Sequence, residues 1–282
     1  MLAAGLGALA TACSAPSSKP PGSASTPVTS SPTTTGSSPA SVSLPPVTPW
    51  RPGAGELVPA CKHAAVRRIE AAGNSPDAAL QVIDAQYGGL LADTASVLVV
   101  TRSWQRHGAH LVPGGHTYDV RLSRAGVRWR VTEVRPSSPG RATTALTAAA
   151  RHVIASGRIS LPPAGAADVR SGQVHDSVLE AMLRMSARHR IHVSVVRSGH
   201  PIYVFGTDRL SDHPQGRAFD TWAIDGRAVV APSTPRSLVE DYMHAAAAAG
   251  SYNVGGPYLL GAAPQWFSDD THHDHVHAGF TT

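Results

Sequence analysis

The sequence predicts an α+β protein with two folded parts, and three observations support that prediction. Helical spacing of apolar residues and alternating strand patterns fall in separate stretches, without the regular succession expected of a parallel α/β sheet. The chain has 282 residues, enough for one large domain or two small ones. Hydrophobic residues make up 42%, an ordinary globular share, so the chain can bury a sizeable core.

The first 13 residues form an apolar run of small residues that ends at Cys13. This pattern resembles a bacterial lipoprotein signal, in which Cys13 would be acylated and become the mature N-terminus. A positive segment before the apolar run is missing, and an ordinary cleaved secretion signal with an incidental cysteine is the alternative. The expected location is the cell envelope, with a lipid anchor on the extracellular face of the membrane.

Residues 14–55 are predicted to be a disordered linker. Ser, Thr and Pro dominate the segment up to Trp50, and Lys19 is its one charged residue. Such a composition buries too little apolar surface to offset the entropy lost on ordering. A lipid on Cys13 followed by this spacer would tether the folded parts to a membrane.

Residues 56–140 are predicted to form a small α+β domain. Its helical part, 56–87, breaks at Gly73-Asn74 and restarts over 78–83, and Cys61 is expected to be a small buried residue there. The domain loosely resembles the NTF2-like cone fold. The strands are expected at 96–101, 117–122 and 128–134, the last two joined by a hairpin turn, and a His-containing segment (His107, His110, His116) is expected to be a solvated loop.

A linking helix is predicted over 141–157, and the second domain over 158–282. Ser177 and Glu180 match a capping box, which predicts a helix that begins at Ser177. Further strands are expected at 191–196, 217–224 and 274–280, with a helix over 234–249 that stops at Gly250.

Two compact groups of chemically active residues lie in this second domain, at 211–220 and 271–277. A catalytic zinc needs three nitrogen or oxygen ligands and an open fourth position, and two cysteines are too few for a Cys-based zinc finger. His213, Asp220 and His277 can supply such a set. A merely solvated His-rich end is the alternative interpretation.

Asp274 is the carboxylate best placed in sequence to accept a proton from water, three residues before His277. His275 and His277 share one side of a strand, so His275 can lie beside the metal. Strand alternation turns Asp274 to the other side, and a base at that position therefore requires the chain to bend there.

The residues Ser211-x-His213-x-x-Gly216-x-Ala218-x-Asp220 match the SxHxxGxAxD motif of zinc D-alanyl-D-alanine carboxypeptidases and related LAS-type peptidoglycan peptidases. Asp274-His275-x-His277 resembles their HxH element with its preceding acidic residue. The resemblance covers residues 158–282 and implies a zinc peptidase domain with a central antiparallel sheet. It implies these roles: zinc ligands His213, Asp220 and His277; general base Asp274, supported by His275; a position near the substrate carbonyl for His272; and a substrate contact from Ser211. It also implies an arginine that stabilises the substrate or transition state, for which Arg197 is the candidate, with a surface arginine at the strand end as the alternative.

The expected function is a zinc-dependent peptidase that hydrolyses peptidoglycan stem peptides in the cell envelope, as a D,D-carboxypeptidase or an endopeptidase. The alternative is an envelope-binding or scaffold lipoprotein whose peptidase-like domain is inactive. A net charge of +5 is too mild to predict nucleic-acid binding. No uninterrupted apolar stretch is long enough to cross a bilayer, so membrane contact is expected through the lipid alone.

Overall fold

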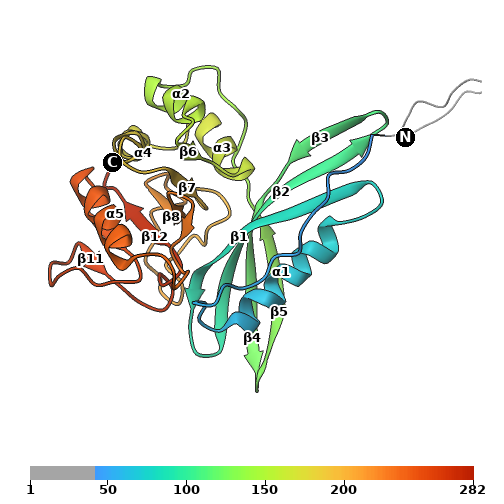
Figure 1. Cartoon of the computed structure of the whole chain (residues 1–282), viewed down its shortest axis with the longest axis horizontal. Helices are drawn as coiled ribbons and strands as arrows, with labels where there is room; N and C mark the ends of the chain where they lie inside the picture. Colours follow the sequence, from blue (N-terminus) through green and yellow to red (C-terminus); the bar gives the residue numbers. More distant parts are fainter. Residues whose placement is uncertain (1–41) are drawn as a thin grey trace, which may run out of the picture. The chain divides into compact units, whose positions relative to one another are not determined.

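Two sheets built from different halves of the chain organise the structure, a computed structural model that describes residues 42–282 (Figure 1). The predicted signal with Cys13, and the predicted linker up to residue 41, lie outside the described residues. The two sheets are mostly antiparallel, and helices pack on both, so the α+β class is confirmed. No helix within residues 42–282 is long and apolar enough to cross a membrane.

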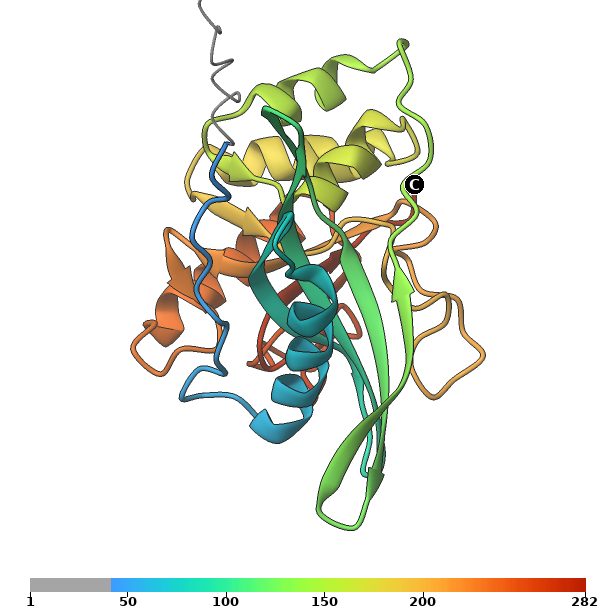
Figure 2. The ribbon, with the colours of Figure 1, turned by 90° about the vertical axis from the view of Figure 1, so that its right-hand side faces the viewer.

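The first sheet is a set of long strands with one helix across a face (Figures 1 and 2). Its strand order is β1-β2-β4-β5, with β3 paired to β2. The predicted hairpin between β4 and β5 is confirmed, and Gly126 in its turn has a φ of 61°. The elements are α1 (Pro59–Gly73), β1 (Ala78–Leu90), β2 (Thr94–His107), β3 (His110–Gly114), β4 (Thr117–Ala125) and β5 (Arg128–Pro136).

The predicted second helix over 78–83 is wrong, because that segment is the start of β1. Its backbone pairs with β2 from Ala78–Gln105 to Leu90–Ala95, and this long-range ladder overrides the weak local helical pattern. The segment that contains His107 and His110 also differs from the predicted loop, since it is a hairpin between β2 and β3. Two register shifts in β1 lie after Val82 and after Tyr87.

Both faces of the first sheet are covered at its centre. On one face, Val97 and Val99 pack with α1, where Cys61 is fully buried as predicted. On the other face, Leu98 and Val100 pack against Val195 from the second half of the chain. Removal of this second apolar face from water stabilises the contact between the two sheets.

The second sheet has short strands in the order β11-β10-β12-β8-β7-β6, with β9 paired to β8. Only its pairs β6–β7 and β10–β11 are parallel. A core of helix and strand residues lies between the sheet and its helices, around Met182, Phe219 and Met243. The elements are α2 (Ala148–Ala155), β6 (Ile159–Ser160), α3 (Pro163–Arg170), α4 (Asp176–Ser186), β7 (Ile191–Val193), β8 (Ala218–Ile224), β9 (Arg227–Ala228), α5 (Arg236–Ala248), β10 (Asn253–Gly255), β11 (Trp266–Phe267) and β12 (Val276–Gly279).

Several predicted boundaries in this half change. The capping box is wrong, because α4 has His175 at its N-cap and the buried Ser177 hydroxyl makes no hydrogen bond. The linking helix starts later than predicted, at Ala148, where the Thr147 side chain accepts from Ala150 N. The last strand begins only at Val276, so Asp274 lies in the irregular segment before it.

Candidate metal centre and its surroundings

Neighbouring strands bring the three predicted metal ligands together. Asp220 on β8 is the register partner of His277 on β12, and the turn before β8 carries His213. The Asp220 Oδ1 atom lies 3.1 Å from His213 Nε2 and 3.0 Å from His277 Nδ1. The two imidazole nitrogens are 3.2 Å apart. All three residues are buried, and we call them the His213 cluster.

The donor atoms of the His213 cluster fit a metal ion. His213 Nδ1 lies 2.7 Å from the carbonyl oxygen of Val196, so its proton is on that nitrogen in the neutral ring. The Nε2 lone pair then faces the lone pairs of the Asp220 carboxylate, and a cation resolves this repulsion. Ligands about 2.0–2.1 Å from a tetrahedral zinc are about 3.3 Å apart, close to the spacing found here.

Electrostatics within the His213 cluster favour the ligand forms of Asp220 and His277. Burial would lower the pKa of His213, but Asp220 outweighs burial and raises that pKa. Burial would raise the pKa of Asp220, but His213 and His275 outweigh burial and hold the pKa well below its usual range. Burial lowers the pKa of His277 to about 4, although Asp220 opposes that shift. At neutral pH the cluster therefore offers an ionised carboxylate and a neutral His277 imidazole.

The turn that carries His213 depends on Gly216. This glycine has a φ of 71°, in the left-handed region that favours glycine. A Cβ there would lie 2.0 Å from the backbone oxygen of Gln173. The small residue in the motif is therefore required by the close approach of two backbone segments.

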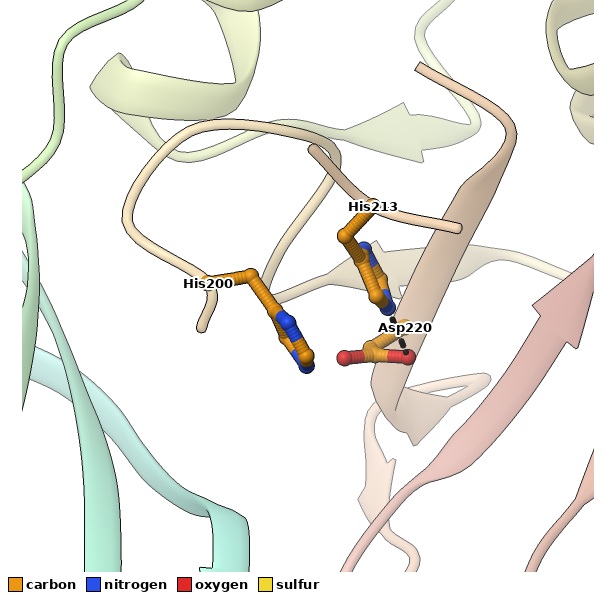
Figure 3. Close-up of side chains that lie close together, drawn as sticks. All are labelled: His200, His213 and Asp220. Atoms are coloured by element: carbon orange, nitrogen blue, oxygen red, sulfur yellow. Dashed lines mark hydrogen bonds and ion pairs between the residues drawn. The ribbon is translucent and has the colours of Figure 1, made fainter. Parts of the chain in front are cut away.

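His200 is a further histidine beside the cluster (Figure 3). Its ring stacks on that of His213 with centroids 4.2 Å apart, and its ligand atom lies within 4.8 Å of those of His213 and Asp220. Its Nδ1 contacts the Pro201 carbonyl oxygen at 2.9 Å. His277 is the better third ligand, because its Nδ1 lies closer to the donor atoms of His213 and Asp220. His200 lies beside His213 and lines the cleft.

Asp274, the predicted general base, has its contacts with His275 and the first half of the chain and none with the His213 cluster among the described residues. Its Oδ1 lies 2.6 Å from His275 Nδ1, and its Oδ2 accepts from Lys62 Nζ at 2.6 Å and Tyr87 N at 3.0 Å. Burial would raise the pKa of Asp274, but Lys62 and His275 hold it far below its usual range. Such a carboxylate is a weak base, and its geometry suits it to orient His275.

His275 connects Asp274 to the metal ligands. Because an ionised carboxylate only accepts hydrogen bonds, His275 Nδ1 donates to Asp274. The other ring nitrogen, Nε2, lies 3.8 Å from Asp220 Oδ2. Its ring also lines the cleft described below, so a proton acceptor at Nε2 is open to a ligand.

A second group of potential ligands, Glu56, His273 and Asp274, surrounds Lys62. Lys62 pairs with both carboxylates and is 0% exposed, so its ammonium group already supplies the positive charge. Both ring nitrogens of His273 are in use, since Nε2 accepts from Leu57 N and Nδ1 contacts the Asp270 carbonyl oxygen. We call these four residues the Lys62 cluster.

A cleft of about 760 Å³ opens above the His213 cluster and is lined from both sheets. Ser211 and His272, two predicted substrate contacts, line it. Ser211 Oγ lies 3.3 Å from His200 Nδ1. The His272 ring lies 5.0 Å from that of His275, and its Nδ1 contacts Asp269 Oδ1 at 2.7 Å. Both residues can therefore touch a ligand bound near the metal ligands.

Arg197 is not brought to the cleft, although the resemblance implied that it stabilises the substrate or transition state there. The backbone N–H groups of Arg197 and Ser198 donate to Asp168 Oδ2, which turns the chain after β7. The Arg197 guanidinium contacts Gln173 and lines a separate pocket of about 360 Å³. Arg209 is the arginine that lines the main cleft, and the sequence carried no motif that marked it.

Two residues that no sequence motif marked reach the site from the first half of the chain, one from the first sheet and one from its helix. Gln86 on β1 donates to Asp220 Oδ2 at 2.6 Å, and its own oxygen accepts from the Ser194 hydroxyl. Lys62 on α1 reaches Asp274. One signal was available for Lys62: it is the single lysine in residues 42–282, and it lies among apolar helix positions.

Neither protein-family models, nor curated proteins, nor solved structures give a match to this chain. The fold and the site therefore define an α+β protein with a buried two-histidine, one-carboxylate cluster beside an open cleft.

Proposed function

We propose that this protein is a zinc-dependent peptidase. One observation carries the proposal: two imidazole nitrogens and one carboxylate oxygen, all buried, converge to within 3.0–3.2 Å beside an open cleft. Two histidines and one carboxylate form a ligand set found in catalytic zinc sites of peptidases. When bound there, zinc would polarise a peptide carbonyl and acidify water.

The protein's own groups would move the proton. His275 Nε2 takes a proton from water as the water oxygen bonds to the carbonyl carbon. Asp274, held ionised, stabilises the imidazolium and keeps the ring oriented through Nδ1. His275 then returns the proton to the amine nitrogen as the C–N bond breaks. This assigns the acceptor role to the Asp274–His275 pair in place of Asp274 alone.

Peptidoglycan stem peptides in the cell envelope are the substrate that we propose. The SxHxxGxAxD match supports this class, and so does the tether expected before the folded parts. Arg209 at the cleft can bind a peptide carboxylate, and Leu91, Phe205 and Phe267 can pack against small apolar side chains.

The test uses the full chain. The purified protein, stripped of metal and reloaded with one equivalent of zinc, should release peptide fragments or D-alanine from purified peptidoglycan, identified by mass spectrometry. His213→Ala is the control and should release nothing. Stoichiometric zinc without any product would favour the inactive envelope-binding alternative over the peptidase.

The proposed lipid anchor has a separate test. Cys13→Ser should move the protein from the membrane fraction to the soluble fraction, because no other acylation site is predicted. Fractionation of cells followed by immunoblotting measures this. Unchanged membrane association would contradict the lipoprotein assignment and leave the peptidase proposal untouched.

A further inference from the structure

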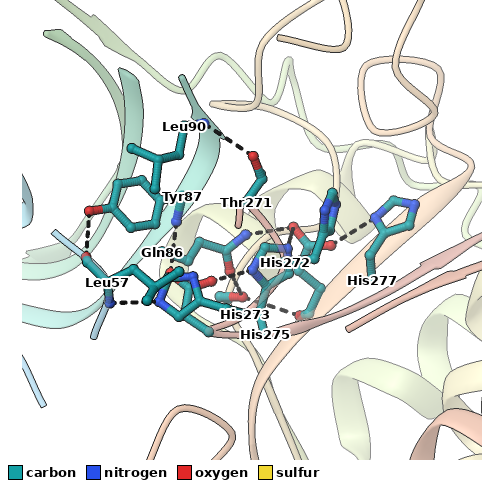
Figure 4. A network of polar contacts seen from close by, with 12 residues as sticks. Leu57, Gln86, Tyr87, Leu90, Thr271, His272, His273, His275 and His277 are labelled. Atoms are coloured by element: carbon teal, nitrogen blue, oxygen red, sulfur yellow. Dashed lines mark hydrogen bonds and ion pairs between the residues drawn. The ribbon is translucent and has the colours of Figure 1, made fainter. Parts of the chain in front are cut away.

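The first sheet and its helix contribute polar groups to a site whose metal ligands all come from the second. Lys62 on α1 pairs with Asp274, and the Tyr87 backbone N–H on β1 donates to the same carboxylate oxygen. Gln86 reaches the metal ligand Asp220, and Leu90 N donates to Thr271 Oγ1 (Figure 4). Apart from Lys62, these contacts come from residues 86–90 of β1, so the connection is built along a strand and not through a single side chain.

Two backbone features of β1, a register shift and a glycine, lie beside these contacts. A register shift follows Tyr87, directly after the two neighbouring residues that contact the second half of the chain: Gln86 by its side chain and Tyr87 by its backbone N–H. Bulges of this kind re-aim groups beside functional sites. Gly89 follows, and a Cβ there would lie 2.0 Å from the Phe205 ring, so the two parts touch closely at the cleft.

The charge balance at Asp274 shows why a lysine is present. A buried, ionised carboxylate is costly unless it is paired and hydrogen-bonded. Asp274 has one oxygen on His275 and the other on Lys62 and the Tyr87 N–H. Lys62 also pairs with Glu56, so removal of its ammonium group would leave both the Glu56 and the Asp274 carboxylates without their ion pair.

We infer that Lys62 is a positioning residue of the active site: it fixes the ionised Asp274 carboxylate, which holds His275 with Nδ1 on Asp274 and Nε2 toward the metal ligands. The first sheet and the second sheet are then one catalytic unit, not a catalytic domain with an independent companion. This inference rests on the proposed peptidase function.

Lys62→Met in the full chain tests the inference. We expect zinc content to stay at one per chain and KM to change little, while kcat falls about 10- to 100-fold, the usual effect of losing a group that orients a metal-site residue. Lys62→Arg, which keeps the charge, should recover part of the loss. Arg67→Met is the matched control, because it removes an exposed positive charge from the same helix.

A double-variant comparison separates positioning from general structural support. If Lys62 acts through Asp274, then Lys62→Met combined with Asp274→Asn should have the same kcat as Asp274→Asn alone. Additive losses would overturn the inference. If Lys62→Met fails to fold, Lys62→Gln, which can still donate a hydrogen bond to Asp274, takes its place in both experiments.

Two other outcomes also overturn the inference. A wild-type kcat in zinc-loaded Lys62→Met would show that Lys62 does not position His275. A faster variant would show that Lys62 restrains Asp274 from acting as the base. Failure of the peptidase proposal is distinguishable, because the wild-type protein would then show no turnover.

Discussion

The His213 cluster and the Lys62 cluster are two groups of carboxylates and histidines that share one stretch of chain, where His273 and Asp274 of one are followed by His277 of the other. Both have potential ligand atoms close to one another. In the Lys62 cluster the chain supplies its own cation, and both nitrogens of His273 are occupied. In the His213 cluster two imidazoles and a carboxylate face one another without a positive side chain between them.

This difference separates two uses of buried carboxylates. A carboxylate that meets a lysine is neutralised permanently, and it can then orient a neighbouring group. A carboxylate that meets imidazole nitrogens and an amide, with no lysine or arginine, leaves a place that an ion from solution can fill. Asp274 and Asp220 both lie beside His275, one at each ring nitrogen, so this single ring connects the cluster neutralised by Lys62 with the cluster that we propose binds a metal.

Removal of a ligand from the His213 cluster should have the largest effect. His213→Ala or His277→Ala should abolish stoichiometric zinc and turnover, because two remaining ligands hold the ion weakly. Elemental analysis after dialysis measures the zinc. His273→Ala, in the Lys62 cluster, is the control and should retain one zinc per chain. Equal losses of zinc in all three variants would contradict the assignment of the metal site to the His213 cluster alone.

Asp274→Asn should have the next largest effect. We expect turnover to fall about 100- to 10,000-fold, the usual worth of a general base system, while zinc remains bound. The amide cannot hold His275 and Lys62 as a carboxylate does. Steady-state kinetics on a stem peptide and zinc analysis of the same sample measure both quantities.

Asp274→Glu serves as its control. The longer acid preserves the charge, so it should retain more activity than Asp274→Asn. Wild-type turnover by zinc-loaded Asp274→Asn would remove the Asp274–His275 pair from the mechanism.

Gly216→Ala should destabilise the turn that holds His213. The added methyl overlaps the Gln173 backbone oxygen and sits on a backbone with positive φ, so we expect a loss of about 3 kcal/mol in unfolding free energy. Gly226→Ala is the control, with a φ of 78° and nothing within 4 Å of the new Cβ. It should lose about 1 kcal/mol. Denaturant unfolding measures both, and equal losses would contradict the close approach.

The smallest expected effect is the contribution of Asp84 to the pH dependence of the unfolding free energy. Its Oδ2 is buried without a hydrogen-bond partner among residues 42–282, and burial raises its pKa to about 7, although Lys62 opposes that shift. The folded protein then binds a proton that the unfolded chain has lost above pH about 4. Stability should therefore fall as pH rises from about 4 to 7.

Asp84→Asn removes this contribution. Unfolding free energies of the two proteins, measured across the same pH range, should diverge, with the wild type losing more stability as pH rises. Parallel curves would show that Asp84 titrates normally.

Sequence alone predicted the parts whose information is local. The β4–β5 hairpin follows from alternating residues and a short turn, and it is present. The meeting of His213, Asp220 and His277 could be predicted because Asp220 follows in the same motif and His277 lies on a strand near the C-terminus.

Long-range partners decided the rest. The segment from Ala78 to Ile83 has no strong strand signal, and only its ladder to β2 makes it a strand. Arg197 lies away from the cleft, and its backbone N–H donates to Asp168, which is distant in sequence. The partner of Asp274 is a lysine from the opposite end of the folded chain, and no local pattern near Asp274 contains it.

The buried thiol of Cys61 gives the molecule a built-in reporter. It is the one free cysteine in residues 42–282, it lies on α1 with 0% exposure in the core between that helix and the first sheet, and burial raises its pKa to about 12. A thiol reagent can reach it only when α1 lifts from the first sheet, so the labelling rate measures how often that local opening occurs. Because Lys62 is the next residue, each such opening also separates the Lys62 ammonium group from Asp274.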